Sequence, residues 1–244
     1  KRLAQAAYDQ MVKLPYYHTF GHKAHGPVVE LAEKLIGMAP VPMSKVYFTN
    51  SGSEANDTAI KMIWYRSNAL GQPQRKIISR VKGYHGVTIA AASLTGLVNN
   101  QRSFDLPIAG ILHTTCPHYR TTKQEGESEE QFSKRCAAEL EELILREGPE
   151  TVAAVFAEPV MGAGGVIVPP KGYWEAIQPV LKKYDILFVA DEVICGFGRT
   201  GEKFGTVTYK LEPDIMTVSK QLSSSYFPIS ALLFNDKVYQ PIAD

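Results

Sequence analysis

Three short runs of apolar residues constrain the fold of this 244-residue chain more than any other feature. They occupy residues 152–157, 186–190 and 215–218, and a helical pattern at residues 172–184 separates the first two. Short strands that are apolar on both faces are typical of a mostly parallel sheet that helices cover on both sides. The sequence therefore predicts an α/β fold.

Weaker patterns extend this prediction along the rest of the chain. Strand-like runs lie at residues 45–49, 76–79 and 229–234, and a helical pattern at residues 54–68 follows the first of them. A further helical pattern at residues 128–146 is amphipathic. Its apolar side carries Phe132, Cys136, Leu140, Leu143 and Ile144. We expect a central, mainly parallel sheet with helices on both faces.

The overall composition excludes several classes of protein. Lys and Arg number 26 against 25 Asp and Glu, so the net charge of +1 does not mark a nucleic-acid or membrane-surface binder. No apolar run is long enough for a membrane span. The sparse cysteines, Cys116, Cys136 and Cys195, favour a reducing cytoplasm over a disulfide framework. We therefore expect a cytoplasmic protein with no nucleic-acid or membrane partner.

Residues 49–56, Thr-Asn-Ser-Gly-Ser-Glu-Ala-Asn, join the end of a predicted strand to the start of a helix. Ser51 and Glu54 have the S-x-x-E spacing of a capping box. Gly52 and Ser53 would leave free backbone N–H groups and a hydroxyl at the positive end of that helix, a seat suited to a phosphate. Taken alone, the segment is explained equally well by an ordinary capped helix.

An acidic residue, Asp191, directly follows the apolar run at residues 186–190. Ligands of open parallel sheets bind outside the carboxyl ends of the strands, so this carboxylate is placed to meet one. Paired with a protonated pyridine nitrogen, it would keep the ring cationic and able to accept carbanion electrons. For an isolated residue of this kind, a helix N-cap is the alternative.

Lys220 follows the apolar run at residues 215–218 and precedes three consecutive serines at residues 223–225. Most lysines are solvated surface residues, and that is the alternative here. A partly desolvated lysine beside a cationic ring would instead become nucleophilic and form a Schiff base with a carbonyl group. The position of Lys220 after a buried strand makes it a candidate for that role.

Tyr84 begins the segment Tyr-His-Gly that leads into the small residues at positions 90–93. An aromatic ring at this place could stack on a flat cofactor, with Gly86 providing clearance. Packing in the core is the alternative for this segment when it is considered alone.

Taken together, these segments resemble the class III (subgroup II) aminotransferases of the fold-type I pyridoxal-phosphate superfamily, and most of all the ω-amino-acid–pyruvate transaminases. The similar segments follow the family's order along the whole chain, at residues 49–56, 82–86, 157–162, 190–201, 213–215 and 219–223. The resemblance implies a fold-type I α/β domain, pyridoxal 5′-phosphate as the cofactor and a transaminase reaction.

The resemblance also implies roles for individual residues. Lys220 would form the Schiff base with the cofactor and move the proton during catalysis, and Asp191 would keep the pyridine nitrogen protonated. The other implied cofactor contacts are Gly52 and Ser53 at the phosphate, Tyr84 and Val193 on opposite faces of the ring, and Glu158 beside the ring. His85 belongs to the same Tyr-His pair, but we assign it no catalytic task.

Two features depart from the family pattern. Gln221 stands where many members have glycine, which narrows the subgroup to the pyruvate-using ω-transaminases. A substrate-carboxylate arginine and a phosphate-binding threonine of the neighbouring subunit are expected beyond Asp244. We expect a fragment of a homodimeric protein, in which residues 1–30 border the small lobe and the active-site entrance. Residues 31–244 would form the large cofactor-binding domain, without the C-terminal domain.

Two further patterns suggest other cofactors but fit them poorly. Residues 196–201 match G-x-G-x-x-G, yet residues 191–195 separate them from the strand and no helical pattern follows, which argues against a nicotinamide-dependent oxidoreductase. His18, His22 and His25 have the spacing of a metal site on one helical face. Gly21 and the following Gly-Pro pair interrupt that helix, so we expect no metal.

The sequence thus predicts a ping-pong transfer of an amino group from an amine or ω-amino acid to an α-keto acid such as pyruvate. A truncated or non-catalytic chain of the same family is the alternative from another class of protein. An aminomutase or a decarboxylase is the alternative within the family. The amino donor and the stereochemistry stay open, because part of the substrate pocket is expected outside this chain.

Overall fold

The structure, a computed structural model, describes residues 1–243 and contains one seven-stranded sheet in the order β1-β7-β6-β5-β4-β2-β3. Neighbouring strands from β3 to β6 pair in parallel, whereas β7 runs antiparallel to both β1 and β6. The strands are β1 Lys45–Thr49, β2 Lys76–Arg80, β3 Ile111–Thr114, β4 Val152–Ala157, β5 Leu187–Asp191, β6 Ile215–Val218 and β7 Ser230–Phe234.

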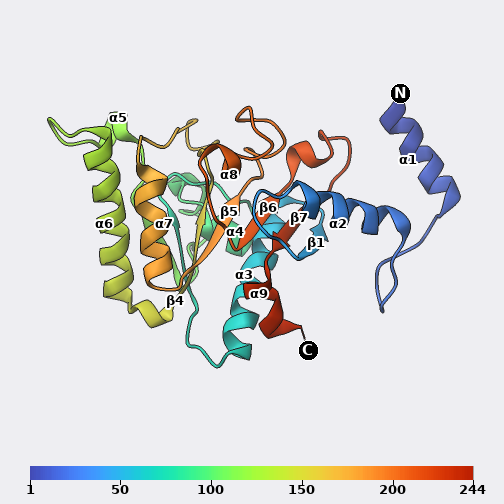
Figure 1. Cartoon of the computed structure of the whole chain (residues 1–244), viewed down its shortest axis with the longest axis horizontal. Helices are drawn as coiled ribbons and strands as arrows, with labels where there is room; N and C mark the ends of the chain where they lie inside the picture. The colour runs from blue at the N-terminus through green and yellow to red at the C-terminus, as the bar shows by residue number, and fades with distance from the viewer. Residues whose placement is uncertain (244) are drawn as a thin grey trace.

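Helices connect these strands and pack on the sheet (Figure 1). The α-helices are α1 Arg2–Lys13, α2 Gly26–Met38, α3 Gly52–Ala69, α4 Ile89–Leu94, α5 Tyr119–Thr122, α6 Glu129–Glu147, α7 Tyr173–Lys183, α8 Gly205–Thr208 and α9 Asp236–Tyr239. Short 3-10 turns are η1 Val98–Asn100, η2 Pro149–Thr151, η3 Lys220–Leu222 and η4 Gln240–Ile242.

The sheet separates two apolar clusters, because successive side chains of a strand point to opposite faces. On β5, Leu187 and Val189 join the cluster that contains Ile60 of α3. Phe188 on the same strand joins the cluster that contains Ile177 of α7. Helices therefore cover both faces of a mainly parallel sheet, and the predicted α/β architecture is confirmed.

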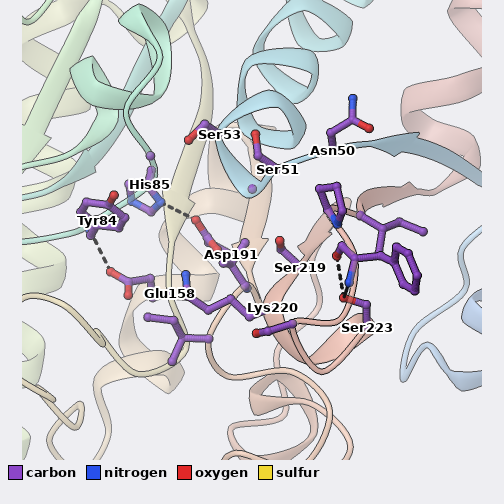
Figure 2. Close-up of a pocket in the computed structure, with 18 residues that line it drawn as sticks. Asn50, Ser51, Ser53, Tyr84, His85, Glu158, Asp191, Ser219, Lys220 and Ser223 are labelled. Carbon is purple, nitrogen blue, oxygen red and sulfur yellow. Dashed lines mark hydrogen bonds and ion pairs between the residues drawn. The ribbon is translucent and has the colours of Figure 1, made fainter. Parts of the chain in front are cut away.

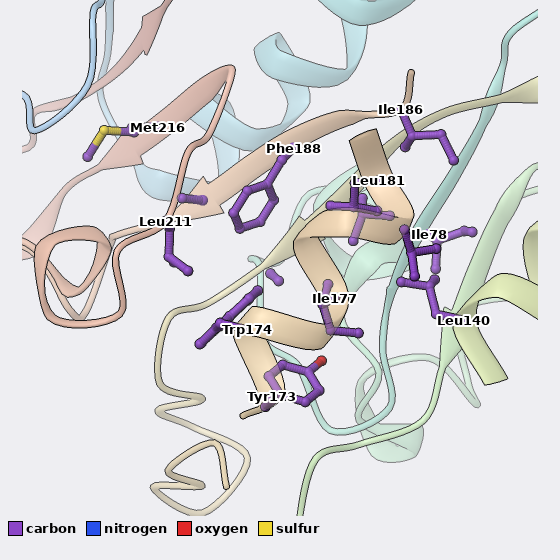
Figure 3. Close-up of a cluster of buried hydrophobic side chains, with 14 of the residues drawn as sticks. Ile78, Leu140, Tyr173, Trp174, Ile177, Leu181, Ile186, Phe188, Leu211 and Met216 are labelled. Atoms are coloured by element: carbon purple, nitrogen blue, oxygen red, sulfur yellow. The ribbon is translucent and has the colours of Figure 1, made fainter. Parts of the chain in front are cut away.

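The face under α6 and α7 carries large apolar side chains. Figure 3 shows Trp174 and Ile177 of α7 in the same cluster of side chains as Phe188 of β5, and the Trp174 and Phe188 ring centroids lie 5.6 Å apart. The predicted apolar side of α6 is buried, with Phe132 at 0% exposure. A capping box closes the start of α6, where the Ser128 side chain accepts a hydrogen bond from the backbone N–H of Gln131. The apolar packing under α6 and α7 therefore stabilises this half of the domain.

The first helix lies apart from this packing. None of the residues of α1 is buried, although Leu3, Tyr8, Met11 and Val12 are apolar and at least half exposed. Figure 1 shows α1 at one end of the molecule, away from the sheet, with α6 and α7 side by side at the opposite end. No helix within residues 1–243 combines the length and the apolar character that crossing a bilayer requires.

The sequence prediction missed β3, α2 and the short helices α4, α5, α8 and α9. β3 was not expected, and it is an edge strand whose burial is limited to its first and last residues, so its apolar signal is weak. α2 begins at Gly26 with Pro27 in its first turn, where proline is tolerated because the first N–H groups of a helix have no intrahelical partner. The same Gly-Pro pair does interrupt any helix running through residues 18–25, as expected.

Candidate functional site

A cavity of about 310 Å³ lies at the carboxyl ends of the parallel strands, where open α/β sheets bind their ligands. All seven residues predicted for the site line this one cavity: Gly52, Ser53, Tyr84, Glu158, Asp191, Val193 and Lys220. Figure 2 shows Asp191 and Lys220 near its centre, with Tyr84 and His85 to one side. Segments separated by more than half of the chain therefore meet here, because each follows the end of a strand or begins the helix after one.

The Asp191 carboxylate is buried, at 2% exposure, and is held by three donors. Its Oδ2 accepts hydrogen bonds from Nδ2 of Asn56 at 3.0 Å and from Nδ1 of His85 at 2.8 Å. Its Oδ1 accepts a hydrogen bond from the backbone N–H of Val193 at 3.1 Å. A carboxylate has about four acceptor positions, so about one remains for a donor in the cavity. The next helix, α8, starts only at Gly205, so Asp191 is not a helix N-cap.

The start of α3 forms another wall of the cavity. The Ser51 side chain accepts a hydrogen bond from the backbone N–H of Glu54 at 3.2 Å, as the spacing predicted. The reciprocal bond differs, because the Glu54 carboxylate accepts from the backbone N–H of Asn50 at 2.7 Å and not from Ser51. The first-turn N–H groups of α3, which have no intrahelical acceptors, include those of Gly52 and Ser53 at the cavity wall.

Two glycines allow close approaches around the cavity. A Cβ atom on Gly52 would lie 3.0 Å from Cγ2 of Val193, so a larger residue would push these two walls apart. A Cβ atom on Gly86 would lie 2.4 Å from Oγ of Ser53, and the backbone φ of Gly86 is +139°. The clearance that Gly86 provides is therefore for the start of α3, and Gly86 also lines the cavity.

Glu158 links the Tyr84 segment to the loop that follows β4. One of its carboxylate oxygens accepts from the backbone N–H of Tyr84 at 3.0 Å, and the other accepts from the backbone N–H of Gly162 at 2.8 Å. Burial raises the pKa of the Glu158 carboxyl group, and the nearby Asp191 adds to the rise. Through these two bonds Glu158 holds Tyr84 at the cavity.

Lys220 lies at the start of η3, directly after the buried strand β6. Its side chain lines the cavity, and the residue is exposed. The backbone φ of Lys220 is +28°, a strained conformation for a residue with a side chain. Strain of this kind is concentrated at functional sites, where the surrounding structure holds it in place.

The sequence prediction missed several residues that line or support the cavity. Asn56 is fully buried one helical turn after Gly52, and it donates to the Asp191 carboxylate. A polar residue at that inward-facing position of α3 is a signal that could have been used. Ser219 also lines the cavity, and His85 contacts Asp191 directly.

The patterns that suggested other cofactors have ordinary structural settings. Residues 196–201 lie in a turn-rich segment between the end of β5 and the four-residue helix α8. Within residues 1–243, no group of three or more His, Cys, Asp or Glu side chains is arranged to hold a metal ion. In the segment with His18, His22 and His25, the Nδ1 atom of His18 accepts a hydrogen bond from the backbone N–H of Phe20.

The arrangement of the cavity suits a flat, charged ligand. It offers helix N–H groups for an anion, a buried carboxylate for a cationic ring nitrogen, an aromatic side chain and a primary amine. Its volume of about 310 Å³ is at the lower end of the range of about 300–1,000 Å³ that is usual for small-molecule pockets.

Known proteins resemble this chain along its whole length. The family model described as Aminotransferase class-III matches residues 1–244. Gamma aminobutyrate transaminase 1, mitochondrial, from Solanum lycopersicum is 55% identical over 97% of this chain and 46% of its own length. Vanillin aminotransferase from Capsicum chinense is 54% identical over 97% of this chain and 52% of its own length. The chain thus spans about half the length of the curated relatives it matches.

Solved structures are similar to this chain as well. A structure titled "Transaminase with L-ala" has a TM-score of 0.98 and 70% identity, covering 99% of this chain and 57% of its own. The omega transaminase from Pseudomonas jessenii in complex with PMP has a TM-score of 0.99 and 65% identity, covering 100% of this chain and 54% of its own. These TM-scores and identities show that the chain shares the fold of these transaminases.

Proposed function

This chain belongs to the class III aminotransferases, and from that premise we propose that it forms the pyridoxal-phosphate-binding part of a transaminase of fold-type I. The reaction would move an amino group from an amine or ω-amino acid to an α-keto acid such as pyruvate. The observation that carries this proposal is the meeting of Asp191, Lys220 and the start of α3 around one cavity.

The residues of the cavity fit this cofactor. Its phosphate would be held by the first-turn N–H groups of α3 at Gly52 and Ser53. About one acceptor position of the buried Asp191 carboxylate is left after its three hydrogen bonds, and it suits the N–H of a protonated pyridine ring. Tyr84 and Val193 would contact the two faces of that ring, and Lys220 offers the amine for its aldehyde.

Pyridoxal phosphate, when bound, supplies an aldehyde that carries the amino group and a cationic ring that stabilises carbanion electrons. Asp191 would keep the ring nitrogen protonated, because a carboxylate in this buried site would interact strongly with a cation. Its three hydrogen-bond donors hold the carboxylate in one orientation for this task.

Lys220 would hold the cofactor covalently through its amine and would move a proton at Nζ during the transfer. The strained backbone at Lys220 directs its side chain into the cavity. Glu158 holds Tyr84 through the backbone N–H of that residue and thereby orients the aromatic contact with the ring.

Pyruvate and an ω-amino acid are the proposed substrates of the full-length protein. The similar proteins support this choice by their names, which include an omega transaminase, a transaminase with L-ala and a gamma aminobutyrate transaminase. L-alanine is the amino acid that transamination converts to pyruvate. A diaminobutyrate–2-oxoglutarate transaminase from Halomonas elongata, 51% identical, makes 2-oxoglutarate the competing keto acid.

A donor panel with the purified full-length protein tests this function. We expect amines and ω-amino acids to convert pyruvate to alanine faster than they convert 2-oxoglutarate to glutamate, as measured by chromatography of the amino acids formed. Formation of glutamate alone would show that the keto acid is 2-oxoglutarate and not pyruvate. Carbon dioxide release or isomerisation of the amine, without transfer to either keto acid, would contradict the transaminase assignment.

The full-length protein is proposed to be a homodimer. Support comes from α1, which has no buried residue although Leu3, Tyr8 and Met11 are apolar. We propose that residues 1–30 border a smaller lobe and that residues 31–244 form the large domain, since the whole sheet lies within the second range. Light scattering of the full-length protein should give twice the mass of one chain, and a monomer mass would contradict the dimer.

A cytoplasmic location is proposed as well. The support is the set of reduced thiols, since Cys116, Cys136 and Cys195 are all free and buried. The similar proteins include enzymes named mitochondrial and chloroplastic, so the compartment needs its own measurement. Fractionation of cells that express the full-length protein at its natural level should recover it with cytoplasmic markers, and recovery with organelles would contradict this location.

A further inference from the structure

Arg80, the last residue of β2, has a long polar side chain that is buried in an apolar part of the domain. The residue is 1% exposed, and its guanidinium group lies over the rings of Trp174 and Tyr173 of α7, at 5.4 Å and 5.9 Å from their centroids. Figure 3 shows both rings in the cluster of apolar side chains under α7. A guanidinium group stacks well on aromatic faces, and this packing partly offsets the cost of its burial.

The hydrogen bonds of Arg80 do not explain its burial by stability alone. Its Nη2 atom donates to the backbone carbonyl oxygen of Glu158 at 2.5 Å. Its Nε and Nη1 atoms are buried and have no hydrogen-bond partner among residues 1–243. An arginine carries five N–H donors, and a buried donor without an acceptor lowers the stability of a fold. Since an apolar side chain of similar length would avoid this cost, the one bond that Arg80 makes points to a role at Glu158.

The main chain after Arg80 leads directly to the cavity. The carbonyl oxygen of Arg80 accepts a hydrogen bond from the backbone N–H of Gly83 at 2.9 Å, which closes a tight turn before Tyr84. Gly96 packs against this turn, because its carbonyl oxygen accepts from the backbone N–H of Lys82 at 2.8 Å and its N–H donates to the carbonyl oxygen of Gly83 at 2.9 Å. The turn is therefore rigid, and Tyr84 follows it at the cavity wall.

Arg80, Glu158 and Tyr84 form a closed chain of contacts. The side chain of Arg80 holds the main chain of Glu158, and a side-chain oxygen of Glu158 accepts from the backbone N–H of Tyr84 at 3.0 Å. Figure 2 shows this second bond at one side of the cavity. The turn of residues 80–83 then joins Tyr84 back to Arg80. Loss of the bond from Arg80 would therefore free the main chain of Glu158 and, through its side chain, the position of Tyr84.

We propose that Arg80 is a positioning residue that acts through Glu158 to hold Tyr84 against the ring of the cofactor. This inference rests on the function proposed above. Arg80 is not one of the residues that line the cavity, so it touches neither cofactor nor substrate. Its contribution is to fix the carboxyl ends of the paired strands β2 and β4 relative to each other, because Tyr84 and Glu158 follow these two ends.

Two substitutions of Arg80 separate this role from a purely structural one. Arg80→Met fills the space with a flexible apolar side chain that packs well on aromatic rings, but it removes the donor to Glu158. Arg80→Lys keeps one donor, which is all that the bond to Glu158 uses, but it packs less well on Trp174. If Arg80 only stabilises the fold, stability and cofactor binding should fall together. If it positions Tyr84, Arg80→Met should be the more stable variant and yet bind the cofactor more weakly.

Binding of pyridoxamine phosphate to the full-length protein gives the most direct readout, because this amine form of the cofactor cannot bond covalently to a lysine. We expect its dissociation constant, measured by equilibrium dialysis, to rise about threefold to tenfold in Arg80→Met, the effect of weakening one aromatic stacking contact. Arg80→Lys should recover most of that loss, although its melting temperature should be the lower of the two. Arg146→Met, at an exposed position of α6, serves as the control and should bind as wild type does.

A double substitution tests whether Arg80 acts through Tyr84. In a Tyr84→Ala background the aromatic ring is already absent, so adding Arg80→Met should raise the dissociation constant by less than about twofold. Full additivity of the two substitutions would overturn the inference, and so would wild-type binding in Arg80→Met. An Arg80→Met variant that is unfolded, or less stable than Arg80→Lys, would overturn it as well, because the fold itself would then require the arginine. Wild-type protein that binds neither pyridoxal phosphate nor pyridoxamine phosphate would instead overturn the proposed function.

Discussion

The two faces of the central sheet use alternate residues of the same strands but differ in what they bury. Under α6 and α7, the side chains are large and apolar, as with Phe132, Trp174 and Phe188. Under the start of α3, Asn56, His85 and Asp191 are buried and polar, and Oδ1 of Asn56 and Nε2 of His85 have no partner among residues 1–243. Each unsatisfied group of this kind costs about 1–3 kcal/mol. Both faces carry an apolar cluster that stabilises the domain, but the face under α3 also gives up stability where its buried polar groups form the site.

The largest effect should come from Lys220, whose side chain lines the cavity. Lys220→Ala in the full-length protein should abolish transamination, because no other amine lines the cavity among the described residues. The melting temperature should stay close to wild type, since Lys220 is exposed. Lys61→Ala, at an exposed position of α3, is the matched control and should keep full activity. Activity retained in Lys220→Ala would show that the chemistry does not depend on the amine on this face of the sheet.

Asp191→Asn should have the next largest effect. The variant should still bind the cofactor but lower the rate of proton removal from the substrate by about a hundredfold or more, because a neutral amide holds the ring proton weakly. All three partners of the Asp191 carboxylate are donors, so the new amide N–H also meets a donor. Single-turnover kinetics with a deuterated donor measure this step. A rate equal to wild type would show that the role assigned to Asp191 is wrong.

On the opposite face, Phe132→Ala should change stability and leave the chemistry intact. Phe132 is fully buried in α6, and truncation of such a ring costs about 3–5 kcal/mol. Denaturant unfolding should report that loss, while kcat of the folded enzyme stays near wild type. Phe132→Leu, which keeps most of the apolar volume, should cost less. A drop in kcat without loss of stability would break the division between the two faces.

A smaller loss of stability is expected at the start of the same helix. Ser128→Ala removes the side-chain acceptor for the backbone N–H of Gln131, and losing an N-cap of this kind costs about 1 kcal/mol. Ser128→Asp, which restores an acceptor, should return most of the stability. The expected change is a lower denaturation midpoint in Ser128→Ala, and no change would mean that α6 is held by its packing alone.

The smallest effect is expected for the reactivity of the cysteine thiols, which lie in both regions of the molecule. Burial raises the pKa of Cys136 in α6, and of Cys195 close to the cavity, from 9.0 to about 12. At pH 8 about one thiol in ten thousand is then ionised, so both should react very slowly with a disulfide reagent. Because the folded-state pKa values are raised, the stability that they contribute is present below about pH 9 and is lost as the pH rises toward 12. Rapid labelling of Cys195 alone would show that the structure near the cavity opens and exposes this thiol.

The parts of the fold that the sequence predicted best are those with a simple physical signal. The apolar runs at residues 152–157 and 215–218 are strands with the same bounds, because a strand buried on both faces has no polar position. The edge strand β3 was missed because only its ends are buried. Several of the site residues could be placed near one another because the carboxyl ends of parallel strands share an edge.

Other parts of the site depend on contacts that no local pattern contains. The bond from His85 to Asp191 joins residues on separate segments, and Asn56 reaches the same oxygen from α3. Lys220 is exposed where its side chain lines the cavity, although the strand before it is buried. Burial of a residue at the end of a strand depends on what covers that end, and the sequence of the strand does not describe this.

Borohydride reduction tests the central claim most directly, namely that Lys220 and Asp191 bind one aromatic aldehyde from two sides of the cavity. The full-length protein would be mixed with pyridoxal phosphate, reduced, digested and analysed by mass spectrometry. The account predicts that the added mass of the reduced cofactor is found on the peptide containing Lys220, in one copy per chain. Attachment at another lysine, with the Lys220 peptide unmodified, would contradict it.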